Sequence, residues 1–238
     1  MFSSKPQNLR SEDLYCYIMQ YLAFNTGKVV TPSLITTTIN KCLCCSYTTN
    51  KTVSHYLREI CKAQLVYEVD REYINSSSEE SNKLRYNRTY YFADYDLFAR
   101  FYDSALNDLF RHKEWSSLSR DTAIAKMLFY HKCINAGYQV KSGVLSFFTH
   151  LENGKTKKNT LSFDFVVITA DSEKYVVFQN NKDFDAAGFT IEAKFALQNI
   201  IKELSVLIIT TSSDFISLDG DSLTYASLDE ILADTIEI

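Results

Sequence analysis

Two short runs in the second half of the sequence are apolar almost throughout, SFDFVVIT at 162–169 and SVLIITT at 205–211. A strand with one face in water alternates apolar and polar residues, whereas a strand covered on both faces is apolar along its whole length. Helical patterns at 118–135 and 190–204 accompany these runs. We therefore expect an α/β sandwich in this half, in which helices cover a central sheet.

The remaining elements of that half complete the sandwich. Further strands are predicted at VLSFFTHL (144–151), at YVVFQ (175–179) and at 223–225. A last helix follows, and its first residues, Ser227 to Glu230, have the pattern of a capping box. The predicted inward positions of the two longer helices are Ile124, Met127, Leu128 and Ile134 in the first, and Ala193, Leu197, Ile200, Ile201 and Leu204 in the second.

The first hundred residues have a different pattern, three helices and a β-hairpin. The helices begin near Ser11, at Thr31-Pro32 and near Asn50, and the hairpin strands are LVYEV (65–69) and TYYFA (89–93). The predicted inward residues of the helices are Leu14, Ile18, Tyr21 and Leu22, then Leu34, Ile35 and Ile39, then Val53, Leu57 and Ile60. Three helices followed by a hairpin are typical of a winged helix, with a helix–turn–helix at 31–63 and the third helix in the recognition position.

Targeting signals and cysteines point to the compartment. The N-terminus lacks the apolar core of a secretory signal, and no run approaches 18 uncharged apolar residues, so we expect a cytoplasmic protein with no membrane partner. The six cysteines are then expected to be thiols. A zinc site at the CLCC cluster (42–45) is the alternative, but Cys61 and His55 are its only neighbouring ligands and form no second pair with a workable spacing.

The charge is unevenly divided along the chain. Residues 1–97 carry 11 Lys and Arg against 10 Asp and Glu, a net +1, whereas the rest carries 14 against 19, a net −5. The protein as a whole has a net charge of −4. Any affinity for DNA is therefore expected in the first half.

Five segments in sequence order carry a family resemblance. They are KTVSHYLREICKAQLVYEV (51–69), TYYFADYDL (89–97), INAGYQVKSG (134–143), SFDFVV (162–167) and YVVFQ (175–179). On these the chain resembles the C-terminal half of a family of bacterial and archaeal AAA-type ATPases, in which a winged helix and a restriction-endonuclease-like domain follow the nucleotide-binding domain. The resemblance implies an α+β protein with a winged helix-turn-helix domain at 1–97, a connector at 98–116 and a restriction-endonuclease-like α/β sandwich at 117–238.

The chain departs from this family at positions that matter for chemistry. It contains no GxxxxGK[ST] motif, so nothing in it can cradle a triphosphate as a P-loop does. Asp96 stands where the family usually has glycine, Lys126 where it often has glutamate, and Ser162 replaces the glutamate before the aspartate.

A nuclease of the PD-(D/E)xK type needs two carboxylates that hold Mg²⁺ and a lysine that activates water. Of that set the resemblance leaves Asp164, while Gln179 and Asn181 stand at the second acidic position and at the lysine position. Lys182 comes one residue late, and on a regular strand its side chain faces away from that of Gln179. We therefore favour a non-catalytic domain without cofactor. The alternative is a Mg²⁺-dependent nuclease that uses Asp164, Gln179 and Lys182 or Glu192.

The predicted third helix offers polar and basic residues for DNA, namely Lys51, Thr52, Ser54, His55, Arg58 and Lys62. Ser46, Tyr47, Thr48 and Thr49 of the turn, and Lys83, Arg85 and Arg88 of the wing, add to this set. The first functional hypothesis is a non-catalytic module that binds double-stranded DNA or a protein. The others are the nuclease above and a platform for self-association.

Overall fold

The computed structural model describes residues 11–43, 47–74, 87–107, 120–150, 154–170, 172–179, 205–210 and 223–233. It is a mixed α+β structure that divides into two compact units. The first contains residues 1–68 and 86–120, and the second contains residues 69–85 and 121–238. No helix of the described ranges is both long and apolar enough to cross a lipid bilayer.

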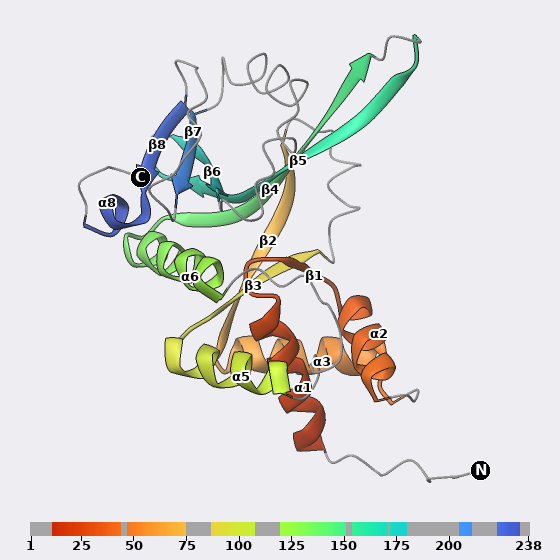
Figure 1. Ribbon diagram of the computed structural model, residues 1–238. Helices are drawn as coiled ribbons and strands as arrows, with labels where there is room; N and C mark the ends of the chain where they lie inside the picture. Colours follow the sequence, from red (N-terminus) through yellow and green to blue (C-terminus); the bar gives the residue numbers. More distant parts are fainter. Residues whose placement is uncertain are drawn as a thin grey trace. The chain divides into compact units, whose positions relative to one another are not determined.

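The first unit has the element order helix, strand, helix, helix, strand, strand, helix (Figure 1). Its elements are α1 (Ser11–Phe24), β1 (Val29–Val30), α2 (Pro32–Cys42), α3 (Asn50–Lys62), the beginning of β2 (Val66–Ile74), β3 (Arg88–Phe92) and α5 (Tyr95–Asn107). β1 pairs with β3 in antiparallel orientation, and β3 lies next to β2 in the sheet.

The core of the first unit follows the apolar periodicity of its helices. All four predicted positions of α1 are buried, and so are Val53, Leu57 and Ile60 of α3. On α2 the prediction is wrong for Leu34, which is 48% exposed, whereas Ile35 and Ile39 are fully buried. Successive residues on a helix are about 100° apart, so this short helix buries Ile35 and turns its neighbour outward.

Aromatic rings join α5 to α1. The ring of Tyr102 stacks on that of Phe24 at 5.9 Å, and Phe101 meets Tyr15 edge-on at 6.5 Å. The side chain of Asp94 begins the helix by accepting a hydrogen bond from the backbone of Leu97 at 2.8 Å. Residues 95–107, which span the expected boundary at 97, are therefore part of the first unit. The rest of the expected connector, residues 108–116, lies outside the described ranges.

The second unit contains a six-stranded mixed sheet with the order β2-β4-β5-β6-β7-β8. Its further elements are α6 (Arg120–Asn135), β4 (Gln139–His150), β5 (Thr156–Ile168), β6 (Glu173–Gln179), β7 (Ser205–Thr210), β8 (Leu223–Ser227) and α8 (Leu228–Leu232). β4, β5 and β6 form an antiparallel meander, whereas β2 with β4, β6 with β7, and β7 with β8 are parallel.

The strand predictions for this unit are confirmed and its helix predictions only in part. Residues 163 and 165–167 of β5 are at most 1% exposed, as expected of a strand covered on both faces. The capping box of α8 is present, with Ser227 and Glu230 bonded reciprocally. On α6 the prediction is wrong for Leu128 and Ile134, which are 42% and 37% exposed. The predicted helix at 190–204 lies outside the described residues.

A β-bulge interrupts the pairing of β4 and β5. Lys141 pairs with Val166 and Gly143 with Phe163, so that two residues of β5, Asp164 and Phe165, lie opposite the single residue between them on β4. A bulge of this kind breaks the alternation of side chains between the two faces of a sheet. Both Asp164 and Phe165 thereby contact α6, as described next.

Candidate functional site

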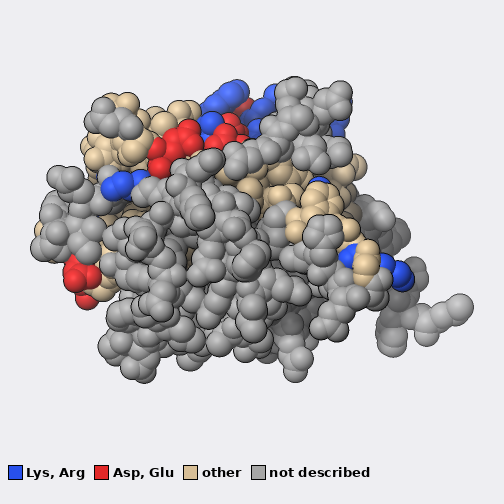
Figure 2. All heavy atoms as spheres, turned by 90° about the horizontal axis from the view of Figure 1, so that it is seen from above, with Lys and Arg blue, Asp and Glu red and all other residues tan. Residues whose placement is uncertain are grey.

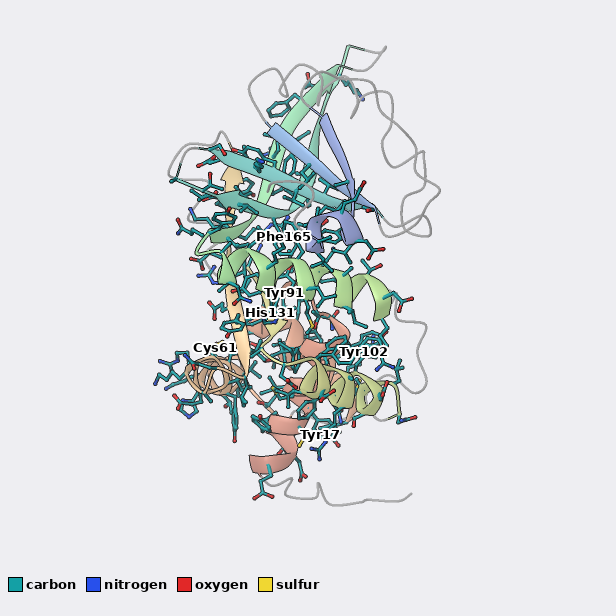
Figure 3. The ribbon with its side chains drawn as sticks, turned by 90° about the vertical axis from the view of Figure 1, so that its left-hand side faces the viewer. Tyr17, Cys61, Tyr91, Tyr102, His131 and Phe165 are labelled. Atoms are coloured by element: carbon teal, nitrogen blue, oxygen red, sulfur yellow. The ribbon has the colours of Figure 1, made fainter. Side chains whose placement is uncertain are left out.

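The bulge of β5 brings a charged and an apolar contact to the same side of α6. The ring centroid of Phe165 lies 5.0 Å from that of Phe129 on α6, and Figure 3 shows Phe165 beside this helix. Phe178 of β6 completes the aromatic cluster, with its ring 5.6 Å from that of Phe129. This cluster forms an apolar wall next to Asp164.

The carboxylate of Asp164 accepts hydrogen bonds at both of its oxygens. The ammonium group of Lys126 on α6 donates to Oδ1 at 2.5 Å, and the backbone N–H of Phe178 donates to Oδ2 at 2.8 Å. The side chain of Lys126 is 6% exposed and that of Asp164 is 21% exposed. The ammonium nitrogen also lies 6.0 Å from the centroid of the Phe178 ring. The aspartate thus joins α6 and β6 within the core.

A second cation lies near this ion pair. Arg71 of β2 donates a hydrogen bond from its guanidinium group to Oγ of Ser162 at 2.9 Å. Burial lowers the pKa of Arg71, whereas the charges of Tyr73 and Asp164 act in the opposite direction. Arginine stays protonated under all ordinary conditions. Arg71 therefore adds a second positive charge, besides that of Lys126, that acts on Asp164.

That charge arrangement differs from the one that a magnesium site requires. Mg²⁺ is held by carboxylate and other oxygen ligands, and a lysine ammonium at Oδ1 of Asp164 repels it. The described residues contain no group of three or more side chains that could hold a metal ion. Gln179 is the last residue of β6, and its side chain, together with Lys182 and Glu192, lies outside the described set.

The second candidate region is the outer side of α3. Four of the six predicted DNA-contacting residues are exposed there, Lys51, His55, Arg58 and Lys62, and the other two, Thr52 and Ser54, are half-buried. The hydroxyl of Thr52 lies 2.9 Å from that of Thr49, which caps the helix by accepting from the backbone of Thr52. Thr52 therefore serves the start of the helix.

One acidic residue divides the basic side of α3. Glu59 accepts a hydrogen bond from the ammonium group of Lys62 at 3.0 Å, and this partner holds the pKa of Glu59 below its usual value. Both side chains are more than half exposed, so the pair adds little to stability. Lys51 and Arg58 lie on the same exposed side nearer the start of the helix.

A single side chain fastens the turn between α2 and α3. Oδ1 of Asn40 accepts from the backbone N–H groups of Tyr47 and Thr48 at 2.8 and 2.9 Å, and its Nδ2 donates to the carbonyl of Thr48 at 3.0 Å. Asn40 is thus a residue that positions α3, and the sequence analysis missed it. The only signal was an amide side chain near the end of a helix, which is not specific.

At the other end of α3, Glu68 binds groups from two elements. It accepts a hydrogen bond from Nε of Arg88 at 2.7 Å, and the Cys61 thiol lies 3.9 Å from its other oxygen. Burial, with a further contribution from Glu68, raises the pKa of Cys61 to about 12. Arg88, one of the three expected wing contacts, is therefore in an ion pair, while Lys83 and Arg85 lie outside the described residues.

The cysteine cluster is described only in part. Cys42 is half-buried, and Cys61 faces Glu68, whereas Cys44 and Cys45 lie outside the described residues.

Figure 2 shows acidic and basic side chains next to one another on the face seen from above, so neither sign of charge covers the described part of that face.

Comparison with known proteins does not identify the chain. Neither the protein-family models nor the curated proteins contain a match. A search of solved structures returns the protein VC1899 from Vibrio cholerae, at 10% sequence identity and a TM-score of 0.27. The match covers 97% of this chain, which spans 55% of the length of that protein. Similarity at this level carries no argument about the fold or the function.

Proposed function

We propose that the protein is a DNA-binding module that does not cleave its ligand. In this proposal the first unit is a winged helix-turn-helix that contacts double-stranded DNA through α3. The second unit is a restriction-endonuclease-like domain in which an internal ion pair replaces the metal centre. The proposal follows the resemblance to the C-terminal part of AAA-type ATPases, and the geometry below supports it.

The order and pairing of the elements in the first unit support the winged-helix part of the proposal. Two helices, α2 and α3, are joined by a short turn that Asn40 fastens, and a three-stranded sheet of β1, β3 and β2 accompanies them. In proteins of this architecture the second helix of the pair enters the major groove with its N-terminal residues toward the bases. That helix corresponds to α3.

The observation that carries the proposal is the two-sided character of α3. Val53, Leu57 and Ile60 are at most 4% exposed and fix one side of the helix in the core. Lys51 and Arg58 are exposed on the other side, where their two positive charges can approach phosphates. Phosphate contacts of this kind provide most of the affinity of a protein for the DNA backbone.

The hydrogen bonds of Asp164 support the non-cleaving part of the proposal. Both carboxylate oxygens accept from protein groups, one of them a nearly buried ammonium. A metal ion at this aspartate would have to displace Lys126, and the displaced ammonium would remain buried without its partner. Breaking a buried ion pair in this way costs about 3–5 kcal/mol. Binding of Mg²⁺ to a single protein carboxylate does not recover this cost.

The nuclease remains the second candidate, because one observation favours it. The hydrogen bond between Phe178 and Asp164 brings β6 to the carboxylate, so that Gln179 is adjacent in sequence to a residue in direct contact with Asp164. An active centre built on Asp164 and Gln179 requires this closeness.

Fluorescence anisotropy with a short labelled DNA duplex at low salt tests the proposal. A variant in which Lys51, Arg58 and Lys62 are all replaced by glutamate is expected to lose its DNA affinity. The slope of log K against log salt is negative, and each phosphate contact that is removed should reduce its magnitude by about 0.9. Arg100→Glu is the matched control for Arg58→Glu, because both arginines are exposed on helices of the first unit but only Arg58 lies on α3. The DNA affinities of these two variants are compared. Equal affinity of the triple variant and the wild type would overturn the proposal.

A further inference from the structure

The hairpin of β4 and β5 extends beyond the rest of its sheet. The two strands pair from Gly143 and Phe163 to His150 and Thr156, whereas β2 pairs with β4 no further than Leu145. β6 pairs with β5 only from Phe165 onward. Within the described residues, the segments 146–150 and 156–160 therefore form a two-stranded ribbon, which Figure 1 shows extending past the sheet. We call this segment the β4–β5 ribbon.

The β4–β5 ribbon is basic although its unit is acidic. Residues 146–160 contain three lysines, at positions 155, 157 and 158, and one acidic residue, Glu152. Residues 69–85 and 121–238, which form this unit, carry 13 Lys and Arg against 20 Asp and Glu. The ribbon is thus a local concentration of positive charge within an acidic part of the chain.

One face of the ribbon presents exposed polar residues and an aromatic ring. Alternate residues of β5 lie on the same face, and Thr156, Lys158, Thr160 and Ser162 are all exposed. Phe148 lies directly opposite Lys158 and is 64% exposed, the largest exposure of any large apolar side chain of the described residues. This face of the ribbon therefore places an exposed aromatic ring directly beside a lysine side chain.

We propose that the β4–β5 ribbon is a second DNA-binding surface, separate from α3. The major groove of B-form DNA is about 12 Å wide and admits a two-stranded β-ribbon. Lys155 and Lys158, which are both exposed, then contact phosphates at the edges of the groove, and Phe148 packs against base edges such as the thymine methyl group. The inference takes its ligand, double-stranded DNA, from the proposed function, but it uses none of the residues of α3.

The test is a titration of a short labelled duplex with a variant in which the three ribbon lysines are replaced by alanine. At 0.1 M salt each lost phosphate contact should weaken binding by roughly fivefold to tenfold. It should also reduce the magnitude of the negative slope of log K against log salt by about 0.9. A Lys→Arg variant at the same three positions keeps the charge and should bind as the wild type does. Lys174→Ala on β6 is the matched control for the loss of a lysine elsewhere in the unit. Phe148→Ser should weaken binding without changing the salt slope.

The two proposals fail in different ways. If the ribbon variant loses affinity and the α3 variant does not, the ribbon is a DNA site and the proposed role of α3 is wrong. If only the α3 variant loses affinity, the ribbon inference is wrong and the proposed function stands. Wild-type affinity in the ribbon variant, tighter binding to single-stranded DNA than to duplex, or a wild-type protein that binds no DNA would each overturn the inference. Urea-unfolding midpoints show that each variant is folded.

Discussion

The ammonium nitrogen of Lys126 lies 2.5 Å from Oδ1 of Asp164, although 38 residues separate them in the sequence. The pair joins α6 to the centre of the sheet at the bulge of β5. Two charges that are removed from water stabilise a fold only when each has its partner, so the two residues depend on each other. That dependence gives the first prediction.

Asp164→Asn should destabilise the protein by about 3–5 kcal/mol, because it leaves the ammonium of Lys126 in the core without a counter-ion. The asparagine can still accept the hydrogen bond from Phe178, so the loss reports on the charge. Lys126→Met should cost less, since Asp164 is 21% exposed and keeps its bond to Phe178. Urea unfolding of the wild type, both single variants and the double variant measures these differences. Additive costs in the double variant would contradict a coupled pair.

Supercoiled plasmid should remain intact when it is incubated with the protein and Mg²⁺ or Mn²⁺. The reason is that Asp164 accepts hydrogen bonds at both oxygens and that the described residues contain no group of three or more side chains that could hold a metal ion. Asp164→Ala, purified in parallel, is the control for contaminating nucleases. Cleavage that the wild type performs and this variant does not would establish the nuclease instead.

Asn40→Ala should weaken DNA binding although Asn40 itself lies in the last turn of α2 rather than on the exposed side of α3. The substitution removes three hydrogen bonds that fix the backbone of Tyr47 and Thr48, and a loss of about 2–3 kcal/mol of stability is expected. Asn40→Asp keeps the acceptor for both N–H groups but loses the donor, so it should lie between alanine and the wild type. Stability follows from thermal unfolding and affinity from anisotropy. Wild-type stability of Asn40→Ala would show that the turn does not depend on this side chain.

Local sequence patterns were sufficient for most elements of the fold. The apolar run at 162–167, the N-cap of α2 at Thr31 and the capping box at Ser227 each depend on residues that are close in sequence, and all three are present. The pairing of Lys126 with Asp164 could not be predicted in the same way. Periodicity places a lysine on the outside of a helix, and only the tertiary fold brings it to a carboxylate 38 residues away.

The sequence analysis also missed features that depend on very few residues. β1 has only two residues, Val29 and Val30, so no alternation can reveal it. The bulge at Asp164 and Phe165 shifts the pairing by one residue inside an apolar run, where either face is compatible with the sequence. Because of this shift, alternation alone assigns one of these two side chains to the wrong face.

Cys61 should react slowly with alkylating agents because its pKa is raised to about 12 by burial and by the carboxylate of Glu68. Only the thiolate reacts, so at pH 8 the reactive fraction is very small. Glu68→Gln removes the negative charge, lowers the pKa of Cys61, and increases its labelling rate. Peptide mapping after iodoacetamide treatment measures this rate. Cys133 is the internal control, since Glu68 is not among the groups that shift its pKa. An unchanged rate at Cys61 would show that burial alone protects it.

Gly143→Ala should destabilise the second unit by about 1–3 kcal/mol, because an added methyl group would overpack the sheet. A Cβ atom at this position would lie 2.8 Å from Cδ1 of Ile74 and 2.8 Å from Cγ2 of Val166. Ile74→Val removes one of these atoms, so it should cost stability in the wild type and recover part of the loss in Gly143→Ala. Gly137→Ala is the contrasting variant, since its φ of +79° is unfavourable for alanine but nothing lies within 4 Å of an added Cβ. Ile74→Val should not relieve the cost of Gly137→Ala, and relief of both would contradict a local steric cause.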